Sequence, residues 1–125
     1  VAKHFMGLLA SQRKSVFAAL SARVGSIEDN RLGGWHAYRA SKAALNMLMR
    51  TCSIELARRN ANAVCVCLHP GTVDTALSRP FQTNVPAGKL FPPALAASQL
   101  LAVIDHLDAN ASGGFYAWDG ERIPF

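Results

Sequence analysis

Residues 33–75 read GGWHAYRASKAALNMLMRTCSIELARRNANAVCVCLHPGTVDT, and this stretch decides the fold. Two glycines precede a long apolar helical run at residues 43–57. A polar break then leads into six consecutive apolar residues, 63–68, which end at a Pro-Gly turn. A continuous apolar run of this length is expected of a parallel strand that is covered on both faces.

The same alternation continues on both sides of this stretch. We expect a helix over residues 2–11 and a strand over 15–20 on the N-terminal side. A helix that begins at Pro92-Pro93 and ends near residue 107 follows, and then a last strand at 115–118. Strands alternating with helices indicate an α/β fold, here a parallel sheet of three strands with flanking helices and right-handed crossovers.

A phenol and an ammonium stand at the head of the long helix. Tyr38 and Lys42 are four residues apart, so they share one helix face. A cation held about 4 Å from a phenolate stabilises it by roughly 4 kcal/mol at an effective dielectric near 20. That could lower a phenol's pKa by up to about 3, which suits acid/base work near neutral pH. By spacing alone, an exposed tyrosine and a solvated lysine remain the simpler interpretation.

The surroundings of this pair resemble the short-chain dehydrogenase/reductase family. A strand followed by a Ser/Gly loop precedes the pair, and a strand followed by P-G-x-V-x-T comes after it. Residues 25–27, 33–46 and 113–125 look like the branch that holds the C-factor-like and sniffer-like carbonyl reductases. The resemblance covers nearly the whole chain and implies the C-terminal half of a Rossmann-like domain. Family members are about twice as long, so we expect residues 1–125 to be the C-terminal part of a single domain. The N-terminal half, with its glycine-rich phosphate loop, is absent.

The resemblance also implies an activity, namely NAD- or NADP-dependent interconversion of a carbonyl and an alcohol by hydride transfer. The substrate would be a small carbonyl or alcohol compound. Tyr38 would be the general acid/base, while Lys42 would lower the pKa of its phenol and bind the nicotinamide ribose. A serine hydroxyl would polarise the carbonyl oxygen.

That serine does not match the family pattern. Relatives usually carry Ser-Ser after the strand and use the second, but Ala22 stands at the second position here. Either Ser21 or Ser26 could take the role, or Ser21 could simply end a strand and Ser26 cap a turn. The missing serine favours an alternative function, a non-catalytic signalling or interaction protein on the same fold.

The Pro-Gly turn follows a strand end, where open α/β sheets bind ligands. By resemblance, Pro70, Gly71, Val73 and Thr75 bind the cofactor, with the Val73 main chain at the carboxamide and the Thr75 hydroxyl at a phosphate. Residues 76–91 look like the family's apolar substrate lid, and a disordered surface loop is the alternative.

Composition excludes several other classes of protein. The net charge is +5, but the basic residues are dispersed, so we expect no nucleic-acid partner. The three cysteines lack metal-ligand spacing, and Cys65 and Cys67 read as small core residues in a strand. No apolar run could span a bilayer and no signal peptide is visible, which predicts a cytoplasmic protein without a membrane partner.

The helix at 43–57 is apolar nearly all round. One side must cover the sheet, and the other is too apolar for water. We expect a homodimer or tetramer through this helix, which carries Tyr38 and Lys42 at its head. Coverage by the absent N-terminal half is the alternative.

Overall fold

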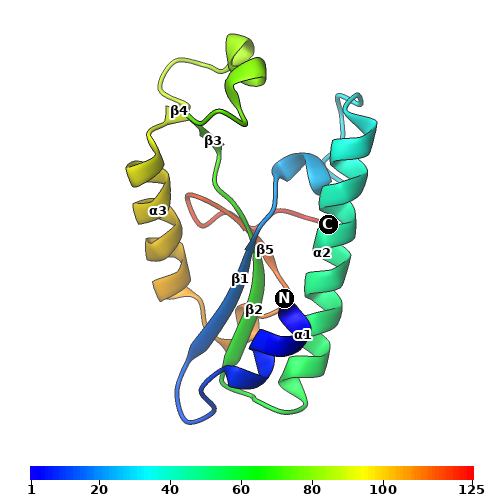
Figure 1. Ribbon diagram of the computed structural model, residues 1–125, viewed down its shortest axis with the longest axis vertical. Coiled ribbons are helices and arrows are strands. Elements are labelled where there is room, and N and C mark those ends of the chain that lie inside the picture. The colour runs from blue at the N-terminus through cyan, green and yellow to red at the C-terminus, as the bar shows by residue number, and fades with distance from the viewer.

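The computed structural model describes residues 1–125 and contains a parallel sheet between two helical layers (Figure 1). The strands are β1 (Ser15–Leu20), β2 (Ala63–His69) and β5 (Phe115–Ala117), in the order β1-β2-β5 and all parallel. The α2 helix (His36–Ala57) covers one face, and α3 (Pro93–His106) covers the other. This confirms the expected α/β, Rossmann-like arrangement of three strands with flanking helices.

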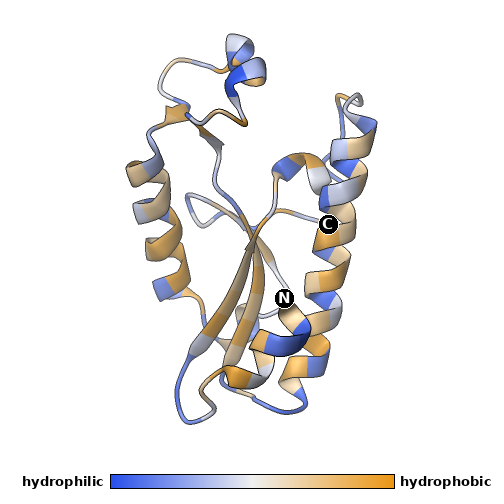
Figure 2. Ribbon diagram, viewed as in Figure 1, coloured by the Kyte–Doolittle hydropathy of each residue, from blue (hydrophilic) through white to orange (hydrophobic).

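The central strand β2 explains why the chain reads as apolar at residues 63–68. Alternate side chains of this strand enter two separate cores, and all six are buried. Cys65 and Cys67 pack under α2 with Met49 and Leu56, while the Val64, Val66 and Leu68 side chains pack against α3. Burial raises the pKa of Cys65 to about 11 and that of Cys67 to about 12, so both thiols stay protonated as core residues. Figure 2 shows the apolar character of the sheet between its helices.

The N-terminal helix is shorter than the expected 2–11. The α1 helix spans Ala2–Phe5, and a 3-10 turn, η1 (Met6–Leu8), follows it. Gly7 lies in that turn, where glycine disfavours a continued α-helix. Two further three-residue 3-10 segments are η2 (Arg23–Gly25) and η4 (Ala109–Ala111).

The segment at 76–91 is organised rather than irregular. It holds a 3-10 helix, η3 (Arg79–Asn84), and ends in β4 (Leu90–Phe91), which pairs in parallel with β3 (Thr72–Val73). We call residues 74–89 the lid, because β3 and β4 close it at both ends. Figure 1 shows it projecting beyond the ends of β1 and β2, on the same side as the start of α2.

Register brings the ends of β1 and β2 together. Leu20 pairs with Leu68, and the Ser21 N–H donates to the Leu68 carbonyl oxygen (2.8 Å). The loops that follow both strands therefore begin at one edge of the sheet, where open α/β folds bind ligands. No helix of the chain combines the length and apolar character needed to cross a bilayer.

Candidate active site

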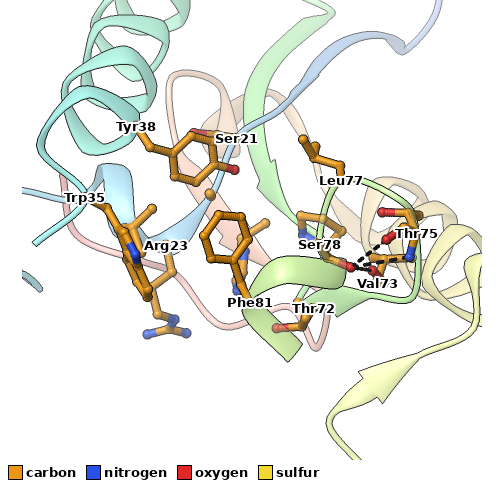
Figure 3. A pocket seen from close by; sticks show the side chains of 15 residues that line it. Ser21, Arg23, Trp35, Tyr38, Thr72, Val73, Thr75, Leu77, Ser78 and Phe81 are labelled. Carbon is orange, nitrogen blue, oxygen red and sulfur yellow. Dashed lines mark hydrogen bonds between the residues drawn. The ribbon is translucent and has the colours of Figure 1, made fainter. Parts of the chain in front are cut away.

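A pocket of about 460 Å³ opens at this edge of the sheet (Figure 3). Four segments supply its walls: the end of β1 with η2, the start of α2, the end of β2 with the turn after it, and the lid. They contribute residues 21–24, Trp35 and Tyr38, residues 69–73, and Thr75, Leu77, Ser78 and Phe81. The structure therefore gathers Ser21, Tyr38 and the Pro70–Thr75 turn around one cavity, although they are far apart in sequence.

Tyr38 and Lys42 occupy the first turns of α2, as their spacing requires. The Tyr38 side chain lines the pocket and is 46% exposed. The Lys42 ammonium lies 5.7 Å from the Tyr38 ring centroid and donates to the Leu20 carbonyl oxygen (3.1 Å). This contact directs the ammonium toward the end of β1.

Ser21 lies at the pocket, but its hydroxyl hydrogen is already engaged. It is 4% exposed and donates to the Asn46 carboxamide oxygen (2.6 Å), while the Asn46 amide donates to the Gly25 carbonyl oxygen (3.3 Å). Asn46 thereby ties the end of β1 and η2 to α2. At Ala22, where the family places its serine, only a methyl group faces the cavity.

Ser26 is not among the residues that line the pocket. It is 2% exposed, and its hydroxyl oxygen accepts the Asp29 N–H (3.0 Å). This is the turn-capping arrangement left open by the sequence. Of the two candidate serines, only Ser21 borders the cavity.

Gly25 lets η2 approach α2 closely enough for the Ser21–Asn46–Gly25 hydrogen bonds to form. A Cβ atom at Gly25 would lie 2.6 Å from the Lys42 Cβ and 2.8 Å from the Lys42 carbonyl carbon. Real Cβ atoms do not approach that closely, so only glycine fits here. The contact fixes the distance between the end of β1 and the helix turn that carries Lys42.

The Pro70–Thr75 turn forms the opposite wall. Gly71 has φ +74°, and a Cβ there would lie 2.6 Å from the Phe91 ring. Phe91 itself packs edge-on against Trp118, with ring centroids 4.7 Å apart. The turn is thus held in place by β4 and the C-terminal segment, with the side chains of Val73 and Thr75 at the cavity.

His69 precedes this turn and borders the pocket. Burial lowers its pKa to about 4, and the nearby Arg23 cation acts in the same direction. Its Nδ1 atom is buried and has no hydrogen-bond partner within the chain. The imidazole is therefore neutral at pH 7.

Arg23 is a cation at the rim of the pocket, and two neighbouring carboxylates compensate its charge. Its guanidinium contacts Asp29 (3.4 Å) and Glu121 (2.8 Å). Burial acts against its charge, but the bonds and charges of these two carboxylates prevail and raise the pKa of Arg23.

Trp35, His69 and Arg23 were assigned no role from the sequence, and Phe81 was assigned only to the segment at residues 76–91. Weak signals existed for two of them. Trp35 stands one helical turn before Tyr38, and His69 directly precedes Pro70 at the strand end. No sequence pattern marked Asn46, whose importance depends on Ser21 across the sheet–helix interface.

The family resemblance assigns Tyr38 and the Pro70–Thr75 turn to the nicotinamide end of a dinucleotide, and both line one cavity. Tyr38 and the Pro70–Thr75 turn face each other across the cavity, and the Thr75 side chain is exposed at its border. No glycine-rich phosphate motif occurs among the 125 residues, so the pyrophosphate cradle is not part of this chain. The chain also lacks any cluster of three side chains that could hold a metal ion.

Comparison with known proteins identifies the family. The profile described as short chain dehydrogenase matches residues 4–86. The chain belongs to this family. Its sequence is 39% identical to that of the C-signal protein of Myxococcus xanthus over 108 residues. These residues are 86% of this chain and 60% of that protein.

Two solved structures share the fold of this short chain dehydrogenase. The carbonyl reductase Sniffer of Drosophila melanogaster matches 99% of the chain with a TM-score of 0.76 and 28% identity. The NADPH-bound carbonyl reductase from chicken fatty liver matches 93% with a TM-score of 0.76 and 31% identity. The chain spans 46% and 47% of these two proteins, and it covers less than two thirds of the C-signal protein.

Proposed function

We propose that residues 1–125 are the C-terminal part of a single Rossmann-like domain that acts as an NAD(P)-dependent oxidoreductase. The whole domain interconverts a small carbonyl compound and its alcohol. One observation carries the proposal: Tyr38 and the Pro70–Thr75 turn line the same cavity at the carboxyl ends of parallel strands. Membership of the short chain dehydrogenase family supports it.

Tyr38 is the general acid/base of the reaction. In the reducing direction, its hydroxyl donates a proton to the carbonyl oxygen, and the bound cofactor supplies the hydride. Lys42, on the next helical turn, stabilises the phenolate that remains and binds the nicotinamide ribose. The Ser21 oxygen stands at the cavity, but its hydrogen must leave Asn46 before it can polarise the substrate.

The cofactor is NAD or NADP, held at its nicotinamide end by Pro70, Gly71, Val73 and Thr75. Gly71 packs closely against the Phe91 ring, and residues of the turn line the cavity. The NADPH-bound state of the chicken carbonyl reductase supports this cofactor class.

The proposal is tested by Tyr38→Phe in the full-length protein. We expect kcat to fall at least tenfold, because a positioned general acid typically contributes 10²–10⁴-fold. Cofactor affinity should stay within a few fold, since only the hydroxyl is removed. Tyr116→Phe is the matched control, because Tyr116 hydrogen-bonds the Ala111 carbonyl oxygen outside the pocket. A Tyr38→Phe enzyme that keeps more than a tenth of the wild-type kcat would contradict the assigned role.

A non-catalytic signalling or interaction protein is the second candidate. Ala22 removes the usual hydroxyl and Ser21 is committed to Asn46, which together favour it. The similarity to the C-signal protein points the same way. A full-length protein that binds NADPH but turns over no carbonyl in a broad panel, even after Ala22→Ser, would favour this candidate.

We further propose a homodimer or tetramer through α2 and a cytoplasmic location. Met47, Leu48 and Ile54 are 67%, 63% and 47% exposed on this helix. Leu48→Glu should then lower the apparent mass in size-exclusion chromatography of the full-length protein. An unchanged monomeric mass for wild type and variant would refute the assembly.

A further inference from the structure

Trp35 has an unusual backbone at the entrance to the pocket. It immediately precedes α2 and adopts a left-handed conformation, φ 48° and ψ 42°. Gly33 and Gly34 before it also have positive φ, at 64° and 69°. Glycine accepts this region freely, but a bulky aromatic residue there is an outlier. Strain of this kind persists only where the surroundings hold it, and it concentrates at functional sites.

Arg39 holds this turn in place. Its Nε donates to the Gly34 carbonyl oxygen (2.9 Å) and its Nη2 to the Gly33 carbonyl oxygen (2.9 Å). Its Nη1 reaches the Val24 carbonyl oxygen (3.2 Å), and the guanidinium lies 5.8 Å from the Trp35 ring centroid. One side chain thus fixes the strained loop and packs against the indole that the loop presents.

Phe81 faces Trp35 from the lid. The two ring centroids are 6.1 Å apart with the planes at 77°, an edge-to-face arrangement. Figure 3 shows both rings beside the Tyr38 ring at the cavity. Trp35 and Phe81 remain 54% and 58% exposed, so each keeps a large apolar surface free.

The base of the lid is fixed by hydrogen bonds, which gives Phe81 a defined position. The Ser78 hydroxyl donates to the Val73 carbonyl oxygen, and the Gln82 amide donates to both the Ser78 oxygen (2.9 Å) and the Asp74 carboxylate (3.0 Å). Gln82 directly follows Phe81 in η3.

We propose that Trp35 and Phe81 form an aromatic subsite that binds a planar apolar group attached to the substrate carbonyl. The inference rests on the proposed function and adds the substrate class. Exposed aromatic faces beside Tyr38 favour a flat ring, because edge-to-face and offset-stacked contacts add to the burial of apolar surface. Arg23 does not select an anionic substituent, since Asp29 and Glu121 already compensate its charge.

The test is equilibrium binding of two ketones with the same number of carbons. Acetophenone carries a planar ring, and cyclohexyl methyl ketone carries a puckered one. The dissociation constants are measured by saturation-transfer NMR on the full-length protein, without cofactor and with NADP⁺, which cannot deliver a hydride to the ketone. Binding is measured without turnover, so a failure of the reductase proposal appears separately, as acetophenone binding without reduction when NADPH is supplied.

Trp35→Leu and Phe81→Leu should each weaken acetophenone binding about three- to tenfold, as expected for losing an aromatic pair. Cyclohexyl methyl ketone should change less than twofold. Phe5→Leu is the matched control, because Phe5 is equally exposed (57%) but lies on α1 away from the pocket, and it should change neither. Unchanged acetophenone binding in Trp35→Leu and Phe81→Leu would overturn the subsite. Equal losses for both ketones, or no binding of acetophenone to the full-length wild type with or without NADP⁺, would do the same.

Arg39 is a positioning residue in this scheme. Arg39→Lys keeps the charge but cannot make the three carbonyl contacts, so Trp35 should lose its fixed orientation. In a Trp118→Phe background, we expect a reduced near-UV circular dichroism signal from Trp35 and weaker acetophenone binding. Arg58→Lys, at the exposed C-terminal end of α2, is the control. An unchanged Trp35 signal in Arg39→Lys would refute the positioning role.

Discussion

Lowering the pH from 7 to 4 should destabilise the fold through His69. Burial, reinforced by Arg23, lowers the pKa of this imidazole from 6.5 to about 4. Between those two values the unfolded chain binds a proton that the folded chain does not, so stability falls as the pH falls. At about 1.4 kcal/mol per pH unit for one proton, the loss across this interval is about 3 kcal/mol.

The assay compares wild type with His69→Gln, which cannot take up the proton. Urea unfolding is followed at several pH values between 7.5 and 4. For a domain of this size, about 3 kcal/mol corresponds to a midpoint change of roughly 1–3 M urea. Carboxylates titrate in both proteins, so the difference between the two curves isolates His69.

The difference should be constant above pH 7 and should shrink or reverse toward pH 4. His106→Gln serves as a control, because that imidazole is exposed at the end of α3. Two parallel stability curves for wild type and His69→Gln would refute the argument that the buried imidazole stays neutral.

Three further substitutions probe the wall between β1 and α2. Gly25→Ala should destabilise the chain by about 1–2 kcal/mol in urea unfolding, because its Cβ would overlap Lys42; a neutral or stabilising result would contradict the close packing. Asn46→Ala should cost about 1–3 kcal/mol by leaving the buried Ser21 hydroxyl without an acceptor, and the Ser21→Ala/Asn46→Ala double variant should cost less than the sum of the single ones. In the full-length protein, Ala22→Ser should raise kcat/KM about tenfold by supplying an oxyanion donor; no gain, combined with inactivity of Ser21→Ala, would show that Ser21 already fills the role.

Patterns that depend on local burial could be predicted well. The run at 63–68 identified β2 because both faces of a central parallel strand are apolar. The two-residue strands β3 and β4 carry no such periodicity, so their pairing was not predicted. The helix expected over residues 2–11 is longer than the observed α1. The prediction relied on the apolar residues and did not account for Gly7, which disfavours a continued α-helix.

The candidate site also contains residues that could be predicted from the sequence and residues that could not. Tyr38 and the Pro70–Thr75 turn could be placed at one pocket, since strand ends of a parallel sheet share an edge. The Ser21–Asn46 hydrogen bond and the Trp35–Phe81 contact join distant segments whose backbone conformations have no sequence signature. The roles of Tyr38, Lys42, Ser21 and the cofactor residues remain predictions until the substitutions are made.

The pairing of β3 with β4 closes the lid at its base. Both ends of residues 74–89 leave the same small sheet, and Phe91 anchors that sheet against Trp118. The sequence and length of the lid can therefore change while the β3–β4 pair still holds its two ends together. Since doubling the length of a closed loop costs only about 0.6 kcal/mol, insertions there are nearly free of thermodynamic penalty. A short chain dehydrogenase built this way can change the residues of its lid without disturbing the cores on either face of β2.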